Sequence, residues 1–319
     1  MALRDFLENI DIQIQATACT DFEIEVSDTK LVPSFNDSNI TFDNFDTKKK
    51  KCKRLESCVL YVDIRDSVKL SAAKKPKTLT KIYSSFVRSM VECGKYYGGH
   101  IRNIIGDRVM VVFDQDNCFE NAVNTAVLMN TVCRKILNKR FSSYTDLQCG
   151  IGIDYGPMLI TKTGTIKQGT EKEFYRSLVW LGRPANVASR LTDIAAKKES
   201  HTVFGVEEGH FYKYLNEWGW YFFEHKEFVN RLEPDVATGK IGHSDANFKS
   251  FIKASRTYSN ENKPIFMTKE VYNGYKNACP DDKSILNNWY KKVDISIRDF
   301  SGDVYSGDVF FTVVEEVME

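Results

Sequence analysis

Two aspartates stand at the ends of apolar segments of the chain. Asp63 closes the run "CVLYVDI" (58–64), and Asp107 follows a glycine between "IRNII" and "RVMVVF". An unbroken apolar run predicts a buried strand, and a Gly-Asp pair between two such runs predicts a hairpin. The pattern therefore predicts two carboxylates at the tips of neighbouring strands.

Either aspartate alone is an ordinary turn residue. Together they have a chemical use, because hard divalent cations such as Mg²⁺ and Mn²⁺ prefer carboxylate oxygens at short range. Two cations bridged by such a pair are suited to an in-line displacement at phosphorus, in which one activates the attacking oxygen and the other holds the leaving oxygens.

A second pair of polar residues lies in "GRPANVASRLTDIAAKK" (182–198), which predicts a helix with a proline in its first turn. Asn186 and Arg190 are four residues apart and share one face of that helix. Both types are common on helix surfaces. An amide one turn from a guanidinium is also what ribose orientation and neutralisation of transition-state charge require.

Composition limits the possible partners. The 319 residues include 44 basic and 43 acidic side chains, so net charge gives no reason to expect nucleic acid or an acidic membrane surface as a partner. Eight cysteines are scattered without a CxxC pair, and no apolar stretch is long enough to span a membrane. We expect a cytoplasmic protein with reduced thiols.

The order of predicted elements defines the fold class. Residues 1–54 are expected to form an N-terminal appendage and linker, in which the basic run "TKKKKCKR" (47–54) is solvated. Residues 55–319 follow the order βαββαββα, a strand–helix pair and a final hairpin, which predicts an α+β sandwich with helices on a mostly antiparallel sheet. A hairpin turn is expected at Tyr155-Gly156. Residues 201–262 break the pattern and are expected to be an inserted subdomain or a dimerisation element.

Four motifs in this order resemble the class III nucleotidyl cyclase catalytic domain: "YVDIRDSV", "IIGDRVMVVF", "GIGIDYGPM" and "GRPANVASRL". The resemblance implies cyclisation of a nucleoside triphosphate with two Mn²⁺ or Mg²⁺ ions. It implies that Asp63, Asp107 and the Ile64 carbonyl bind the metals, that Asn186 orients the ribose, and that Arg190 stabilises the transition state. It also implies a homodimer in which one protomer supplies the metal ligands and the other supplies Asn186 and Arg190.

The positions that read the base depart from the purine cyclases of this family. The resemblance assigns this role to Asn103 and Val179, where purine cyclases carry Lys or Glu and Asp, Thr or Cys. Asn103 offers a donor and an acceptor, whereas Val179 offers neither. The triphosphate lysine has no clear match, and Lys291, Lys292 and Arg298 are candidates.

These departures, with the appendage and the insertion, resemble the pyrimidine cyclases of the bacterial Pycsar antiphage system. That resemblance implies synthesis of cyclic UMP or cyclic CMP, with UTP favoured over CTP, and a separate effector that responds to the cyclic nucleotide. Two alternatives stay open. One is an adenylate cyclase with an unusual base pocket, and the other is a cyclase-like module that senses a nucleotide without turning it over.

Overall fold

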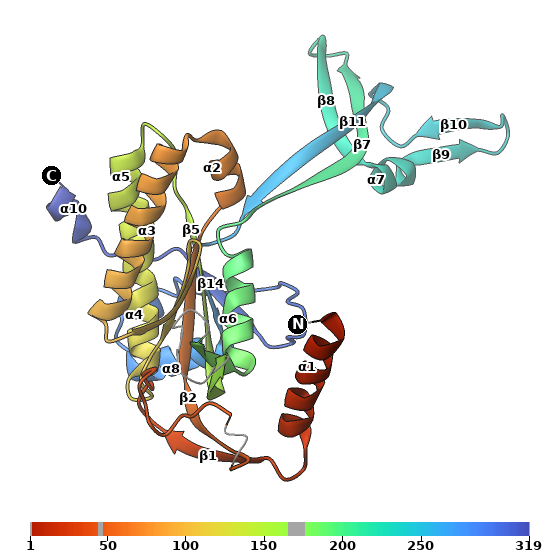
Figure 1. Cartoon of the computed structure of the whole chain (residues 1–319). Helices are drawn as coiled ribbons and strands as arrows, with labels where there is room; N and C mark the ends of the chain where they lie inside the picture. Colours follow the sequence, from red (N-terminus) through yellow and green to blue (C-terminus); the bar gives the residue numbers. More distant parts are fainter. Residues whose placement is uncertain (1, 44–46, 165–175, 319) are drawn as a thin grey trace. The chain divides into compact units, whose positions relative to one another are not determined.

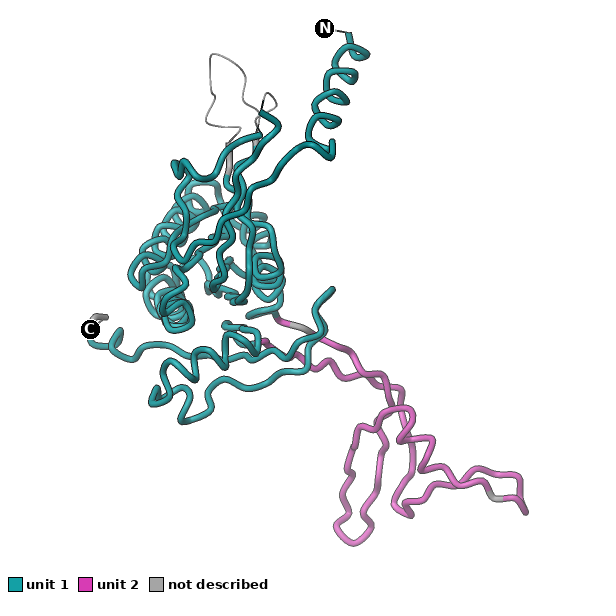
Figure 2. The backbone as a smooth tube through the Cα atoms, turned by 90° about the horizontal axis from the view of Figure 1, so that it is seen from below, with its two compact units in different colours: residues 1–197, 263–319 teal, residues 198–262 magenta. Residues whose placement is uncertain are grey.

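The chain divides into two compact units, which Figure 2 shows in different colours. The computed structural model describes residues 2–43, 47–164 and 176–318. Unit 1 comprises residues 1–197 and 263–319, and unit 2 comprises residues 198–262. Each unit has its own sheets and its own buried interior, so the two are described in turn.

Unit 1 holds most of the helices and strands of the chain (Figure 1). Its first half contains α1 (Leu3–Ala18), β1 (Glu23–Thr29), β2 (Lys49–Ile64), α2 (Ser67–Ala73), α3 (Pro76–Tyr96), β3 (His100–Ile105), β4 (Arg108–Val112) and α4 (Cys118–Thr131). A π-helical segment (Val132–Leu137) and α5 (Asn138–Phe141) extend α4. There follow β5 (Cys149–Gly164), β6 (Arg176–Leu181), α6 (Arg183–Ile194), β12 (Ile265–Thr268), α8 (Lys269–Ala278), α9 (Lys283–Leu286), β13 (Lys291–Val293), β14 (Val304–Gly307) and α10 (Val314–Met318).

A nine-stranded sheet runs through unit 1 in the order β13-β14-β12-β5-β2-β4-β3, with β1 beside β2 and β6 beside β5. Among the described strands, β12 pairs with β5 and β1 pairs with β2 in parallel, and the other pairs are antiparallel. The longest ladder joins β2 to β5 at the centre, from Lys53 opposite Ile160 to Ile64 opposite Cys149. The predicted α+β fold with a mostly antiparallel sheet is confirmed.

Helices cover both faces of this sheet (Figure 1). On one face α3, α4 and α8 enclose a core that includes Leu60, Val62 and Phe86. On the other face α6 packs on a smaller core that includes Val59 and Met110. Because side chains alternate along a strand, Asp63 shares the α6 face with Val59.

The turn predicted at Tyr155-Gly156 is wrong. Residues 149–164 form the single strand β5, which continues through Gly156 with φ of +152°. Strand β2 supplies an unbroken row of partners here, including Cys58 opposite Tyr155 and Ser57 opposite Gly156. These backbone hydrogen bonds keep the segment extended, and the antiparallel partner of the second half of β5 is β6.

The basic run at residues 47–54 is also different from the solvated linker that we expected. Strand β2 begins at Lys49, six residues before the predicted domain boundary, and β1 pairs with its first half. The basic side chains there meet acidic partners, as in the Lys53–Asp37 ion pair at 2.6 Å. This pairing removes most of the positive charge that the sequence suggested.

The N-terminal helix α1 buries none of its residues, although Leu3, Leu7 and Ile14 give it an apolar side. No described helix combines the length and the apolar character that crossing a membrane would need.

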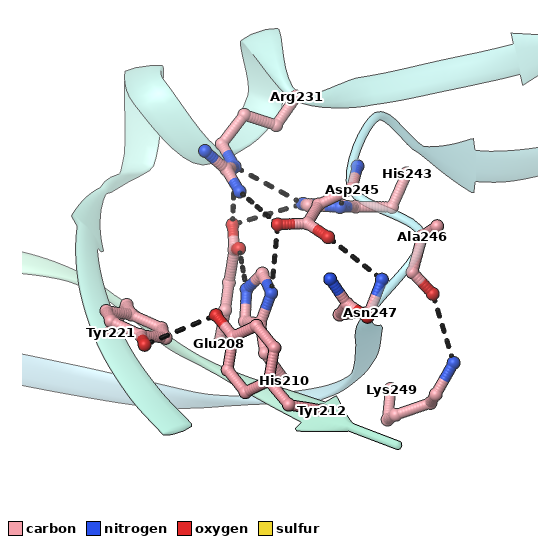
Figure 3. Close-up of polar contacts among 10 residues, drawn as sticks. All are labelled: Glu208, His210, Tyr212, Tyr221, Arg231, His243, Asp245, Ala246, Asn247 and Lys249. Carbon is pink, nitrogen blue, oxygen red and sulfur yellow. Dashed lines mark hydrogen bonds and ion pairs between the residues drawn. The ribbon is translucent and has the colours of Figure 1, made fainter. Parts of the chain in front are cut away.

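Unit 2 is built on a three-stranded antiparallel sheet in the order β11-β7-β8. Its strands and helix are β7 (Lys198–Tyr212), β8 (Glu217–Glu224), α7 (His225–Asn230), β9 (Leu232–Asp235), β10 (Lys240–His243) and β11 (Phe248–Glu261). One face of the sheet carries a fully buried carboxylate, Glu208 (Figure 3). His210 Nε2 lies 2.7 Å from one Glu208 oxygen, and Arg231 Nε and His243 Nε2 each lie 3.2 Å from the other. Unit 2 therefore neutralises its buried charge with its own residues.

Helix α6 lies against the backbone of β5 at Gly152. A Cβ atom at this position would stand 2.2 Å from the Ala188 carbonyl oxygen and 2.5 Å from the Thr192 nitrogen. Both neighbours are backbone atoms of α6, so they could be relieved only by moving the helix. Glycine at this position therefore sets the distance between α6 and the sheet.

We expect Gly152→Ala to lower the free energy of unfolding by about 2 kcal/mol or more, as overpacking at a rigid contact does, and to lower catalytic activity because α6 moves. Denaturant unfolding and turnover of nucleoside triphosphate measure the two effects. Gly242→Ala is the matched control, since its Cβ would meet no atom closer than the Glu233 carbonyl oxygen at 3.4 Å. Equal stability of the two variants would contradict the role of Gly152.

Candidate active site

The two aspartates singled out from the sequence lie at one end of adjacent strands. Asp63 is the penultimate residue of β2, and Asp107 occupies the turn between β3 and β4, after Gly106 with φ of +63°. Strands β2 and β4 are paired neighbours in the sheet. The Ile64 N–H donates a hydrogen bond of 3.2 Å to Asp107 Oδ2, which fixes the turn against the end of β2.

The two carboxylates are close enough to affect each other. Burial, and after it the neighbouring Asp63, raises the pKa of Asp107 to about 6. Like charges held together in a partly buried place are unfavourable unless a cation joins them. This electrostatic arrangement favours a bound cation.

Asp63 supplies the most direct sign of such a site. Its Oδ1 atom is buried and has no hydrogen-bond partner among the described residues. A buried carboxylate oxygen without a partner is costly, and a divalent cation would satisfy it. Among the described residues, no three His, Cys, Asp or Glu side chains form a metal-binding group. Two carboxylates are nevertheless a sufficient protein contribution for Mg²⁺, which commonly completes its shell with substrate phosphates and water.

Arginine side chains that the sequence reasoning missed surround Asp63. Arg108 Nη2 and Nε lie 2.7 and 3.1 Å from Asp63 Oδ2. Arg65 Nη2 lies 3.9 Å from the same oxygen and its Nη1 donates to the Asp193 carbonyl at 3.1 Å. Strand alternation was the available signal for Arg108, because it falls on the same face of the sheet as Asp63 once β2 and β4 are paired.

Helix α6 contacts Arg108 through two of its side chains. Ser189 Oγ accepts a hydrogen bond of 2.9 Å from Arg108 Nη1, and the Asp193 carboxylate accepts one from Arg108 Nη2. Ser189 and Asp193 are four residues apart, so they present one face of the helix to the strand. The structure thereby joins the first, second and fourth motifs within a single chain.

Asn186 and Arg190 lie on α6 beside these residues. Asn186 is exposed, while the Arg190 guanidinium binds the carbonyl of Arg298 and lies 3.2 Å from Asp299 Oδ2. Asp299 is 70% exposed, so this ion pair is solvated and weakly held. In this chain Arg190 is directed at the turn before β14 rather than at its own Asp63.

The two predicted base-reading residues fall on opposite faces of the sheet. Asn103 is exposed on β3 and lies opposite Met110, after an irregularity at residues 101–103. Val179 on β6 lies opposite Thr161, whereas its neighbour Trp180 lies opposite Ile160 on the α6 face. Tyr61 on β2 lies opposite Met110 on β4. Tyr61, Trp180 and Asn103 therefore lie on the same face of the sheet as Asp63. The register therefore brings the Tyr61 ring, and not Val179, close to Asn103, whereas Trp180 lies opposite Ile160, eight residues along β5 from the partner of Tyr61.

The three candidates for binding the triphosphate, Lys291, Lys292 and Arg298, differ in their ion-pair partners. Lys292 forms an ion pair of 2.7 Å with Asp303, whereas Arg298 Nε lies 3.6 Å from Asp299 Oδ2, and both pairs are exposed. Lys291 is exposed on β13.

A further buried carboxylate, Asp154, supports the start of α6. Asp154 Oδ1 accepts a hydrogen bond of 2.7 Å from Thr268 Oγ1 and lies 3.4 Å from Arg183 Nη2. Arg183 is the first residue of α6 and also donates to the Tyr155 carbonyl at 2.9 Å. Asp154 thus links β5 to the helix that carries Asn186. Burial raises its pKa to about 6, although Thr268 and Arg183 act in the opposite direction.

The sequence of the chain is similar to those of known nucleotidyl cyclases. Residues 50–203 match the family model described as the adenylate and guanylate cyclase catalytic domain. Over 178 residues the chain is 29% identical to a uridylate cyclase from Burkholderia cepacia, an alignment that covers 54% of this chain and 72% of that protein. A cytidylate cyclase from Staphylococcus aureus is 36% identical over 107 residues, which are 31% of this chain and 25% of that protein.

Among solved structures, the adenylyl cyclase CyaB from P. aeruginosa is 17% identical, with a TM-score of 0.47 and coverage of 80% of this chain and 94% of that chain. The family match, together with the order of the four motifs, defines the class of this protein. Residues 50–203 form a class III nucleotidyl cyclase domain, of a class whose members use divalent metal ions, and the chain is a nucleotidyl cyclase.

The raised pKa of Asp154 predicts a pH dependence of stability. The folded chain keeps the proton up to about pH 6, whereas the unfolded chain releases it near the ordinary value of 3.8. Stability that depends on this proton is therefore lost as pH rises through this window. Relative to Asp154→Asn, we expect the wild type to lose up to about 3 kcal/mol of unfolding free energy between about pH 4 and 7.

Denaturant unfolding at several pH values measures this difference, with Asp116→Asn, an exposed position, as control. If the difference in unfolding free energy between the wild type and Asp154→Asn stays constant from about pH 4 to 7, burial does not raise the pKa of Asp154.

Proposed function

We propose that this cyclase converts a pyrimidine nucleoside triphosphate, with UTP preferred over CTP, to the 3′,5′-cyclic monophosphate and pyrophosphate. The observation that carries the catalytic part is the pair Asp63 and Asp107 at adjacent strand ends, with a buried Asp63 oxygen that has no partner among the described residues. In the reaction the 3′-oxygen loses its proton and bonds to the α-phosphorus, and the bond from that phosphorus to the bridging oxygen of the β-phosphate breaks.

The roles of the residues follow from their chemistry. Asp63, Asp107 and the Ile64 carbonyl would hold two divalent cations, Mn²⁺ or Mg²⁺, which activate the 3′-hydroxyl and neutralise charge on the phosphates. Asn186 would hydrogen-bond the ribose and hold the 3′-oxygen in line with the α-phosphorus. Arg190 would leave its exposed partner Asp299 and stabilise the charge that develops on the α-phosphate.

We propose that the site is shared between two protomers, with Asp63 and Asp107 from one and Asn186 and Arg190 from the other. The direction of Arg190 supports this division, because its guanidinium is turned to the 298–299 segment of its own chain. The domain division expected from the sequence is part of the proposal, with residues 55–319 as the catalytic domain and about 201–262 as an insertion. Unit 2, residues 198–262, is the compact body that corresponds to this insertion.

The preference for a pyrimidine rests on two supports. Asn103 stands where purine cyclases carry Lys or Glu, and relatives named uridylate cyclase occur in Burkholderia cepacia and in Gulbenkiania mobilis, the latter 26% identical over 189 residues. Tyr61 and Asn103 both lie opposite Met110 of β4, where the Tyr61 ring would narrow the space for a base. The cyclic nucleotide would act as a second messenger in antiphage defence and activate a separate effector.

The dimeric site predicts complementation between two inactive variants. Asp63→Ala and Arg190→Ala should each abolish cyclisation, because each removes a group from every site. A mixture of the two should regain up to about half of the wild-type activity, since one complete site is rebuilt in each heterodimer. Separation of cyclic product from triphosphate measures activity. Continued inactivity after heterodimers have been verified would place all four residues in one chain.

The base preference is tested by competition among UTP, CTP, ATP and GTP in one reaction. We expect UTP and CTP to be consumed well ahead of the purines, with UTP first. Asn103→Ala should lower both the rate and the selectivity, because a site that hydrogen-bonds the base edge rejects mismatched edges. Tyr61→Ala should raise the relative turnover of ATP by enlarging the space for the base.

Val179→Ala is the matched control, since Val179 lies on the opposite face. If ATP is consumed first, the alternative of an adenylate cyclase is correct, in line with a relative of that name from Anabaena cylindrica that is 28% identical over 138 residues. Absence of turnover for every nucleotide would favour a nucleotide-sensing module.

A further inference from the structure

Arg108 binds one carboxylate oxygen of Asp63 with two of its nitrogens. Two of its nitrogens, Nη2 at 2.7 Å and Nε at 3.1 Å, converge on the same atom, Asp63 Oδ2. Both side chains are largely buried, with exposed fractions of 25% for Arg108 and 15% for Asp63. Charge-assisted hydrogen bonds at this degree of burial are strong. The guanidinium is therefore the main counter-ion of Asp63 in the chain by itself.

The other carboxylate oxygen is in the opposite condition. Asp63 Oδ1 is buried and has no partner among the described residues, and Asp107 is held beside the end of β2 by the hydrogen bond from the Ile64 N–H. One oxygen of Asp63 is thus bound by Arg108, and the other has no partner in the described part of the chain. A cation that binds both carboxylates must share Asp63 with a fixed positive charge.

Helix α6 gives Arg108 a second set of partners. Its Nη1 donates to Ser189 Oγ at 2.9 Å, and its Nη2 also binds the Asp193 carboxylate. Asp193 is 58% exposed, so its charge remains available to Arg108 when the Asp63 bond weakens. The guanidinium can stay where it is, held by α6, while the negative charge of Asp63 is drawn toward another cation.

We propose that Arg108 is a built-in competitor of the divalent cation for Asp63, and that Asp193 on α6 sets how strongly it competes. The proposal rests on the metal site at Asp63 and Asp107 described above. Arg108 lowers the affinity for metal in the chain without substrate, since two positive charges repel across a partly buried site. It also stabilises the aspartates before metal arrives, because a buried charge without a partner is costly.

The two arginine contacts predict effects of opposite sign. Arg108→Gln removes the competing charge, so Mn²⁺ should bind about tenfold more tightly than to the wild type. Asp193→Asn removes the alternative partner, so Arg108 holds Asp63 more firmly and Mn²⁺ should bind several-fold more weakly. A residue with only a structural role would not produce this inversion, because loss of packing weakens binding in both variants.

The experiment titrates Mn²⁺ into the whole protein without nucleotide and measures the bound fraction by calorimetry or by the paramagnetic resonance signal of free Mn²⁺. Arg134→Gln is the matched control, because Arg134 pairs with Asp308 away from Asp63. Arg108→Lys keeps the charge but lacks the two-nitrogen contact and should fall between the wild type and Arg108→Gln. This conservative variant and Asp193→Asn test the proposal if Arg108→Gln fails to fold.

Asp107→Ala distinguishes failure of the proposed metal site from failure of the proposed role of Arg108. If Asp107→Ala leaves Mn²⁺ binding intact, the metal site of the proposed function is wrong. If it abolishes binding while Arg108→Gln, Arg108→Lys and Asp193→Asn bind Mn²⁺ as the wild type does, or all more weakly, the metal site stands and the role of Arg108 is overturned.

Discussion

The close contact between helix α6 and strand β5 is the constraint on which the site depends. Gly150 and Gly152 allow the helix to lie on the strand backbone, where a side chain would strike the carbonyls of Ala188 and Thr192. The same helix carries Asn186, Ser189, Arg190 and Asp193. A shift of the helix would therefore move the ribose and phosphate groups of the proposed mechanism together, and the link from Asp154 to Arg183 resists such a shift.

Electrostatics at the strand ends reflects two opposing requirements. Two carboxylates must remain available for cations, yet in a partly buried place they repel each other and raise the pKa of Asp107. Arg108 reduces that repulsion, and Asp63 Oδ1 has no hydrogen-bond partner within the residues that the structure describes. The chain thus tolerates its own unfavourable charges without closing the position that a metal would take. This arrangement connects the energetics of the fold to the proposed chemistry.

Unit 2 is independent of these constraints in its internal organisation. Its buried Glu208 is matched by Arg231 and two histidines from within the unit (Figure 3). Trp218 and Trp220 are about half exposed on the opposite face of the same sheet, with their rings stacked at 6.2 Å. A segment with its own sheet and its own charge balance can be inserted in the sequence between α6 and β12 without changing the strand order of unit 1.

The sequence by itself determined the α+β class, the positions of Asp63 and Asp107 at strand ends, and the shared helix face of Asn186 and Arg190. Each of these depends on local periodicity, which the chain carries in its own pattern. It did not determine that β5 runs straight through Tyr155 and Gly156, that Lys49–Arg54 belong to β2, or that Val179 faces away from Asn103. Those features depend on the register between strands. The contacts of Arg108 with Asp63, Ser189 and Asp193 join residues up to 85 positions apart, so only the tertiary structure could bring them together.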